Sequence, residues 1–363
     1  MKNNYFKLLL KKIYSKIFVM RDIGNMQSSI NNPKLKKRKI FSVVGGNLHP
    51  DKVFYVIQRH PGFGFFSNLI FVINHIKIAV DMGFIPMVDM QNFTNIYNEK
   101  KKIFNTFNSW EYYYEQISPY TLEEVYKSKN IILTDKTFYA DIDFTNDINK
   151  KKELIEIFNK YIKVKENKLK TIKYLKQKLF KKKKILGIHF RGTGYKFSQV
   201  KYPITTNQMI NKVNKLLETE GYERIFIMTE DENNFQILKK YYGEKLIFLN
   251  TSVRGKTNME VYDHYPRSRH RYKIGRNVLM ETYLLSYCDG FIDIETNPKI
   301  MVQAINLNTS QQRYTVDNGI CAKWPVPPYM DYSWHLKNIL SEKFGGFKNN
   351  KKPIKNWYNG KLN

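Results

Sequence analysis

The chain has 363 residues, 42% of them hydrophobic and 15% aromatic, which excludes general disorder and suffices for two domains of ordinary size. Its 61 Lys and Arg against 32 Asp and Glu residues give a net charge of +29, which favours a polyanionic partner, although a lysine-rich compositional bias explains the excess equally well. The two cysteines lie far apart without metal-ligand spacing, so neither a zinc site nor a disulfide framework is indicated, and a reducing compartment fits best.

The first 39 residues form a basic segment. Apolar residues from Phe6 to Met20 fall on one side of a helical wheel and lysines on the rest, which is typical of a helix lying on an anionic membrane. A surface helix packed on its own protein is an equally good interpretation. The stretch is too short and too charged to span a bilayer, and it lacks the apolar core of a signal peptide. We expect a polar, lysine-rich linker to follow.

A first domain is predicted over residues 40–180. The strand, helix and strand that indicate a parallel sheet are expected at 53–58, 69–82 and 84–90. A loop with two glycines joins the first strand to the helix, and a long helix or a helix pair over 151–180 ends the domain.

A second domain is predicted over residues 181–329, where strands and helices alternate as in a doubly wound parallel sheet. The strands are expected at 185–190, 224–229, 245–250 and 290–295, and the helices at 207–218, 232–241, 277–287 and 299–305. Residues 330–363 form a C-terminal extension that we expect to pack back across the domains. Two such sheets in tandem place their carboxyl ends around a central cleft, where ligands bind.

The strand ILGIHF stops at an arginine and two glycines. His189 and Arg191 lie on the same side by the period of two, while Gly192 and Gly194 allow a tight turn. The planar fork of arginine offers paired donors that suit phosphate. An interdomain salt bridge beside a packed histidine is the alternative.

Four segments, in order, resemble motifs of the α1,2-, α1,6- and protein-O-fucosyltransferases. They are HPGFGFFSN at 60–68, GIHFRGTGYK at 187–196, IFIMTEDENNFQILKKYYG at 225–243 and GRNVLMETYLLSYCDGFIDIETN at 275–297. The resemblance covers residues 59–304. It implies the GT-B fold, with two Rossmann-like domains of which the first holds the acceptor and the second a GDP-sugar.

The resemblance also implies roles for single residues. Arg191 would hold the β-phosphate and stabilise it as it leaves, and Asn68 would approach the pyrophosphate and the transferred sugar. His189 would contact the nucleotide, and the Glu281 carboxylate would accept hydrogen bonds from guanine. The other implied donor-binding positions are Gly62, Gly64, Gly192, Glu230, Asp231, Thr296 and Asn297.

Structural interpretations stand beside these roles. Glu281 fits a solvated helix face, Asp231 a helix cap, and the glycines Gly62 and Gly64 a tight turn. Arg267–Lys273 (RSRHRYK) fits either a phosphate-facing rim or, slightly better, a solvated loop. No catalytic base is identified, although Asp89, Glu111 and Glu115 are candidates. The aromatic run Trp110, Tyr112, Tyr113 and Tyr114 suits sugar stacking, but core packing is the safer expectation.

The sequence therefore predicts an inverting transferase that moves fucose from GDP-fucose to a hydroxyl of a surface glycan of the lipopolysaccharide or capsule type. We expect no metal or other cofactor, since Arg191 neutralises the diphosphate, and no nucleic-acid partner. The expected location is a bacterial cytoplasm, at the inner face of the membrane. Another GDP-sugar such as a GDP-heptose, a nucleic-acid-binding protein, and an inactive relative remain alternatives. The last follows from Gly194, where the family usually has aspartate.

Overall fold

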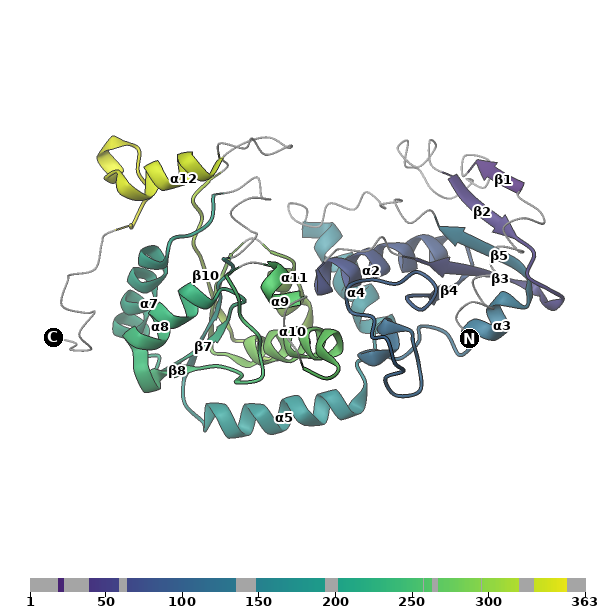
Figure 1. The fold of residues 1–363 in the computed structure, drawn as a ribbon, viewed down its shortest axis with the longest axis horizontal. Coiled ribbons are helices and arrows are strands. Elements are labelled where there is room, and N and C mark those ends of the chain that lie inside the picture. Colours follow the sequence, from purple (N-terminus) through teal and green to yellow (C-terminus); the bar gives the residue numbers. More distant parts are fainter. Residues whose placement is uncertain are drawn as a thin grey trace. The chain divides into compact units, whose positions relative to one another are not determined.

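The computed structural model describes residues 19–22, 39–58, 64–134, 148–192, 202–256, 258–262, 267–294, 296–319 and 330–350 (Figure 1). The expected N-terminal helix up to residue 18, Gly62 and Gly194 lie outside these ranges. The chain divides into two compact units. Unit 1 comprises Met1–Leu169 and Arg271–Gly275, and unit 2 comprises Lys170–His270 and Arg276–Asn363.

Unit 1 contains a five-stranded mixed sheet in the order β1-β2-β5-β3-β4. Its strands are β1 (Val19–Asp22), β2 (Lys39–Val43), β3 (Leu48–Ile57), β4 (Ile85–Val88) and β5 (Ser128–Thr134). The expected parallel pairing of β3 with β4 is confirmed. Strand β5, which was not predicted, pairs with β3 in parallel, whereas the pairs β2–β5 and β1–β2 are antiparallel. The antiparallel part was not predicted, and β1 includes Met20, which we had assigned to a helix. Sheets that combine a parallel part with an antiparallel edge are common among α/β folds.

The core of unit 1 forms where β3 meets α2 (Phe65–Asp81). Residues 54–57 of β3 are almost completely buried, as expected of a central strand covered on both faces. Helix α2 starts four residues earlier than predicted and ends before Gly83, whose φ of 69° suits a residue without a side chain. The region 151–180 is a helix pair, α4 (Ile148–Tyr161) and α5 (Glu166–Phe180), and α5 belongs to unit 2 from Lys170 on. The short helices η3 (Ser109–Tyr112) and α3 (Leu122–Tyr126) lie between β4 and β5.

Unit 2 contains a five-stranded sheet in the order β10-β9-β6-β7-β8, parallel throughout. Its strands are β6 (Ile185–His189), β7 (Arg224–Met228), β8 (Leu246–Ile247), β9 (Gly290–Asp293) and β10 (Gln312–Thr315), and its helices include α7 (Thr206–Glu220), α8 (Glu232–Tyr242), α9 (Asn258–Tyr262), α10 (His270–Tyr287) and α11 (Asn297–Ile305). This is the strand order of a doubly wound sheet, as the alternating pattern predicted. The fifth strand, β10, was not predicted, because its side chains are mostly exposed and it has no apolar run.

Two predicted boundaries in unit 2 are wrong. Helix α10 begins at His270 and not at 277, so residues 270–273 are its first turn and no solvated loop. The strand expected over 245–250 shortens to two residues, after which the chain turns toward the carboxyl edge of the sheet.

The C-terminal segment packs on unit 2. It forms α12 (Met330–Ile339, yellow in Figure 1) and η5 (Glu342–Phe344). The Trp334 indole donates to the Pro203 carbonyl at 2.8 Å, and Gln208 Nε2 donates to the Lys348 carbonyl at 2.7 Å. Within the described parts of the chain, no helix combines the length and the apolar character needed to cross a bilayer.

Candidate active site at the carboxyl edge of the unit 2 sheet

The strand order of unit 2 reverses between β6 and β9, which are neighbours in the sheet although two strands separate them in sequence. The connections leaving these strands diverge, and ligands of doubly wound proteins bind in the resulting crevice outside the carboxyl ends. The sequence places His189 and Asp293 at those two ends, and Glu230 and Asp231 just beyond the neighbouring β7.

His189 is a buried, neutral histidine at this edge. Its side chain is 2% exposed, and its Nδ1 lies 3.0 Å from the Thr296 hydroxyl. Burial, assisted by the positive charge of Arg191, lowers the pKa of His189 to about 3. An imidazole that stays neutral offers one hydrogen-bond donor and one acceptor, and its orientation here is fixed by Thr296.

Arg191 lies at the exposed lip just after β6. Its Nε is 3.3 Å from Glu230 Oε1, and its side chain is one-third exposed. The same carboxylate oxygen accepts the Gly192 backbone N–H at 3.2 Å. Glu230 therefore holds both the guanidinium and the turn behind it, which leaves a partly solvated cation at the strand end, as a phosphate-binding role requires.

Gly192 and Asp231 are packed against each other. A Cβ built at Gly192 would overlap the Asp231 carboxylate, so only glycine fits. Asp231 is buried, and its Oδ1 accepts the Asn234 N–H at 2.8 Å as the N-cap of α8. Asp231 therefore makes the contact expected of a helix cap.

Glu281 lies in the interior of α10, 4% exposed, which excludes the solvated-face interpretation. Its Oε1 accepts the Ser252 hydroxyl at 2.6 Å. Burial raises the pKa of Glu281 to about 7; Ser252 and Arg254 oppose the rise, and Glu230 adds to it. Because Glu230 pairs with Arg191 and also acts on Glu281, the two predicted nucleotide contacts belong to one electrostatic network of unit 2.

Thr296 and Asn297 lie at the start of α11. Thr296 occupies the N-cap position, but its hydroxyl contacts His189 and the Ile294 carbonyl and does not cap the helix. The first-turn N–H groups are therefore not capped by that side chain. A helix start that its N-cap side chain leaves uncapped is a favourable place for an anion.

Ser252 and Arg254 were not identified from the sequence. They lie in the segment NTSVRG that follows β8, and the Arg254 guanidinium stacks 3.9 Å from the Phe235 ring centroid. Their position in the sequence could have revealed them, because polar residues that follow a parallel strand lie at the carboxyl edge of the sheet.

In unit 1, Gly64 and Asn68 lie at the start of α2. Gly64 is the N-cap with a φ of −64°, and a Cβ built there would meet open space, so neither backbone conformation nor packing requires glycine. This argues against the tight-turn interpretation for Gly64. Asn68 is buried, and its N–H donates to the Gly64 carbonyl at 3.1 Å.

Asp89, the buried candidate for the catalytic base, is engaged in hydrogen bonds with neighbouring residues of unit 1. It is fully buried and accepts hydrogen bonds from Gln91, Asn92 and the Tyr126 hydroxyl. Glu111 accepts from the side-chain amides of Asn108 and Gln116. Glu115 forms an ion pair with Lys165 and is half exposed. Asp89 is therefore a structural residue, a correction to its candidacy.

The aromatic run of unit 1 is part of the core. Trp110, Tyr112, Tyr113 and Tyr114 are at most 3% exposed. Tyr113 stacks on Tyr272, with ring centroids 5.8 Å apart, and donates to the Tyr272 carbonyl at 3.0 Å. The safer expectation of core packing is confirmed, and sugar stacking by these rings is excluded.

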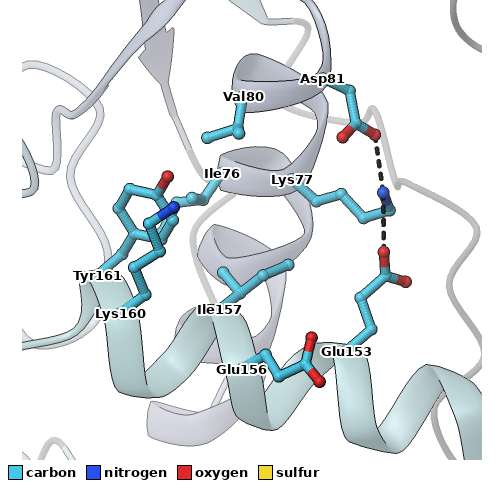
Figure 2. Close-up of a pocket in the computed structure, with 9 residues that line it drawn as sticks. All are labelled: Ile76, Lys77, Val80, Asp81, Glu153, Glu156, Ile157, Lys160 and Tyr161. Atoms are coloured by element: carbon cyan, nitrogen blue, oxygen red, sulfur yellow. Dashed lines mark hydrogen bonds and ion pairs between the residues drawn. The ribbon is translucent and has the colours of Figure 1, made fainter.

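A separate pocket of about 220 Å³ lies between α2 and α4 (Figure 2). At its edge Lys77 bridges Asp81 at 2.7 Å and Glu153 at 2.8 Å. None of the predicted site residues lines it. Across the described ranges, no three His, Cys, Asp or Glu side chains are arranged to hold a metal ion.

Comparison with known proteins gives matches in structure only. The sequence matches no protein-family profile and no curated protein. A crystal structure of NodZ α1,6-fucosyltransferase co-crystallised with GDP aligns at 14% identity and a TM-score of 0.43, over 70% of this chain and 92% of that one. A fucosyltransferase NodZ from Bradyrhizobium aligns at 13% identity and a TM-score of 0.40. A POFUT1 complex with GDP-fucose aligns at 10% identity and a TM-score of 0.40, over 73% of this chain and 98% of that one.

Proposed function

We propose that the protein is a glycosyltransferase that moves a sugar from a GDP-sugar to a hydroxyl of a surface glycan. Fucose is the expected sugar. The observation that carries the proposal is the electrostatic network at the carboxyl edge of unit 2. A partly exposed arginine, a neutral buried histidine and an uncapped helix start lie beside the β6/β9 switch point, and a buried carboxylate is linked to the arginine through Glu230. A diphosphate and a guanine base are the groups that such an edge suits.

Each residue of the candidate site has a separate role in the proposed reaction. Arg191 and the start of α11 bind the diphosphate and stabilise the charge that develops as the sugar leaves. Neutral His189 hydrogen-bonds the nucleotide without adding charge. The Glu281 carboxylate accepts the N1–H and 2-amino hydrogens of guanine together. For Gly64 and Asn68 of unit 1, the roles toward the pyrophosphate and the transferred sugar are those that the resemblance implies.

The acceptor oxygen attacks the anomeric carbon opposite the departing GDP, so the configuration inverts. The acceptor's proton goes to a general base other than Asp89, whose carboxylate already accepts four hydrogen bonds. The proposal needs no metal ion, because positive protein groups face the diphosphate. It includes a cytoplasmic location beside an anionic membrane, which fits the net charge of +29.

A panel of GDP-sugars tests the proposal. GDP release is measured with GDP-fucose, GDP-mannose and a GDP-heptose, in the presence and absence of EDTA. We expect release from GDP-fucose above all, unaffected by the chelator, and loss of release in Arg191→Ala. Preference for another GDP-sugar corrects the sugar but keeps the enzyme class. Binding of GDP without release from any donor, on any acceptor offered, identifies a non-catalytic protein and contradicts the proposal.

A further inference from the structure

The segment Thr251–Gly255 after β8 is fixed at both ends. Gly255 N–H donates to the Glu230 carbonyl at 3.0 Å, and its own carbonyl accepts the Glu232 N–H at 3.1 Å. At the other end, the Thr251 carbonyl accepts from Asn277 Nδ2 at 2.6 Å and from Arg267 Nη1 at 2.9 Å. The backbone that carries Ser252 and Arg254 is thus held by protein groups alone, without need of a ligand.

Arg254 is a partly buried arginine, with two of its nitrogen atoms shielded from solvent. Its plane lies over Phe235 at 3.9 Å and near Phe248 at 5.5 Å. Its Nε and Nη2 are buried and have no hydrogen-bond partner among the described residues, and Nη1 makes only a long contact of 3.4 Å to the Ser252 carbonyl. Unsatisfied donors in an interior are costly, so a charge retained there calls for an electrostatic reason.

The groups that act on the neighbouring Glu281 supply that reason. Ser252 donates a hydrogen bond to it, Arg254 adds positive charge, and Glu230, itself paired with Arg191, adds negative charge. In turn, the acidic groups that act on Arg254 are Glu281 and Glu232. Among these groups, Arg254 carries the positive charge. It lowers the pKa of Glu281, against the rise that burial and Glu230 cause.

We propose that Arg254 is a positioning residue that keeps the Glu281 carboxylate ionised, and thereby fit to accept hydrogen bonds from guanine. This inference rests on the proposed function, since it concerns how the same site selects its base. Arg254 does not touch the nucleotide; it acts through Glu281. Such a residue is needed because burial raises the pKa of Glu281 to about 7 even though Ser252 and Arg254 lower it. A protonated carboxyl would lose one of its two acceptor positions toward the base.

The test is the pH dependence of GDP affinity between pH 5.5 and 9, measured by calorimetry on the full chain. Wild type is expected to bind more tightly as pH rises through about 7. Arg254→Met keeps the length and apolar stem but removes the charge, so its midpoint moves up by at least about one pH unit, with affinity restored at the alkaline end. Arg254→Lys keeps the wild-type midpoint, as does the control Arg224→Met, whose guanidinium contacts the Glu244 carbonyl elsewhere in unit 2.

Glu281→Gln separates the carboxylate from the diphosphate, which itself titrates near pH 6. Its residual pH dependence is subtracted from that of each variant. An unshifted midpoint in Arg254→Met, or a loss of affinity equal at every pH, overturns the role of Arg254. Arg254→Gln serves as a second neutral variant should the methionine variant not fold. A wild-type protein that binds no GDP at any pH overturns the proposed function itself, a distinguishable result.

Discussion

Two buried carboxylates, one in each unit, illustrate how a structural acid differs from one available to a ligand. Asp89 in unit 1 accepts four hydrogen bonds, from the backbone of Gln91 and Asn92, the side chain of Asn92 and the Tyr126 hydroxyl. Glu281 in unit 2 accepts one from Ser252 among the described residues. Burial raises the pKa of both. Burial alone therefore does not mark a functional acid; unused acceptor capacity distinguishes Glu281.

The largest expected effect is on the stability of unit 1. Asp89→Ala leaves two backbone N–H groups and the Tyr126 hydroxyl without their acceptor, so the free energy of unfolding should fall by about 3 kcal/mol or more. Urea denaturation measures it, and GDP affinity of the folded fraction should not change. A variant as stable as wild type would show that Asp89 has no structural role.

Arg191→Ala tests the candidate site in unit 2, which contains Glu281. Because its charge faces the departing diphosphate, removing it should lower turnover by about 100-fold, or about 2.7 kcal/mol. Arg224→Met is the matched control, since this arginine of unit 2 lies at the amino end of β7. Steady-state GDP release measures both, with circular dichroism as the check on folding. Equal rates in Arg191→Ala and wild type would remove Arg191 from the mechanism.

Gly192→Ala tests the packing of the turn behind Arg191. The added Cβ overlaps the Asp231 carboxylate and displaces the α8 cap, which should cost about 1–3 kcal/mol of stability. Thermal unfolding measures the loss. If the variant unfolds like wild type, the turn must have room that the structure does not show.

Gly64→Ala should have the smallest effect on stability. The φ of −64° and the open space around the built Cβ predict a change of no more than about 0.5 kcal/mol. If the donor pyrophosphate approaches this surface, turnover falls nonetheless. Unaltered turnover would mean that nothing binds against Gly64.

The doubly wound sheet of unit 2 was predictable because β6, β7 and β9 are short apolar runs with helical periodicity between them. The strands β1, β2, β5 and β10 were not predicted. Strand β2 adjoins a lysine run and β10 has mostly exposed side chains, so neither stands out by its hydrophobicity. Helix α10 starts among basic residues, which resemble a solvated loop until Tyr272 is seen packed on Tyr113.

At the site, the strand ends identified His189 and Arg191, because the chain direction in a parallel sheet fixes where such residues lie. The burial of Glu281 and the contribution of Ser252 and Arg254 depend on how the segment after β8 folds against α8 and α10. Contacts between segments 29 residues apart, such as Ser252 with Glu281, have no periodicity by which sequence reveals them.

Calorimetric titration with GDP, UDP and CDP at pH 8, on wild type and Glu281→Gln, tests the central claim most directly. A guanine-reading carboxylate predicts that wild type binds GDP at least about 10-fold more tightly than UDP or CDP, and that the glutamine variant loses most of this preference while retaining its diphosphate contacts. Equal affinity of wild type for the three nucleotides, or a preference that survives in Glu281→Gln, would contradict the account.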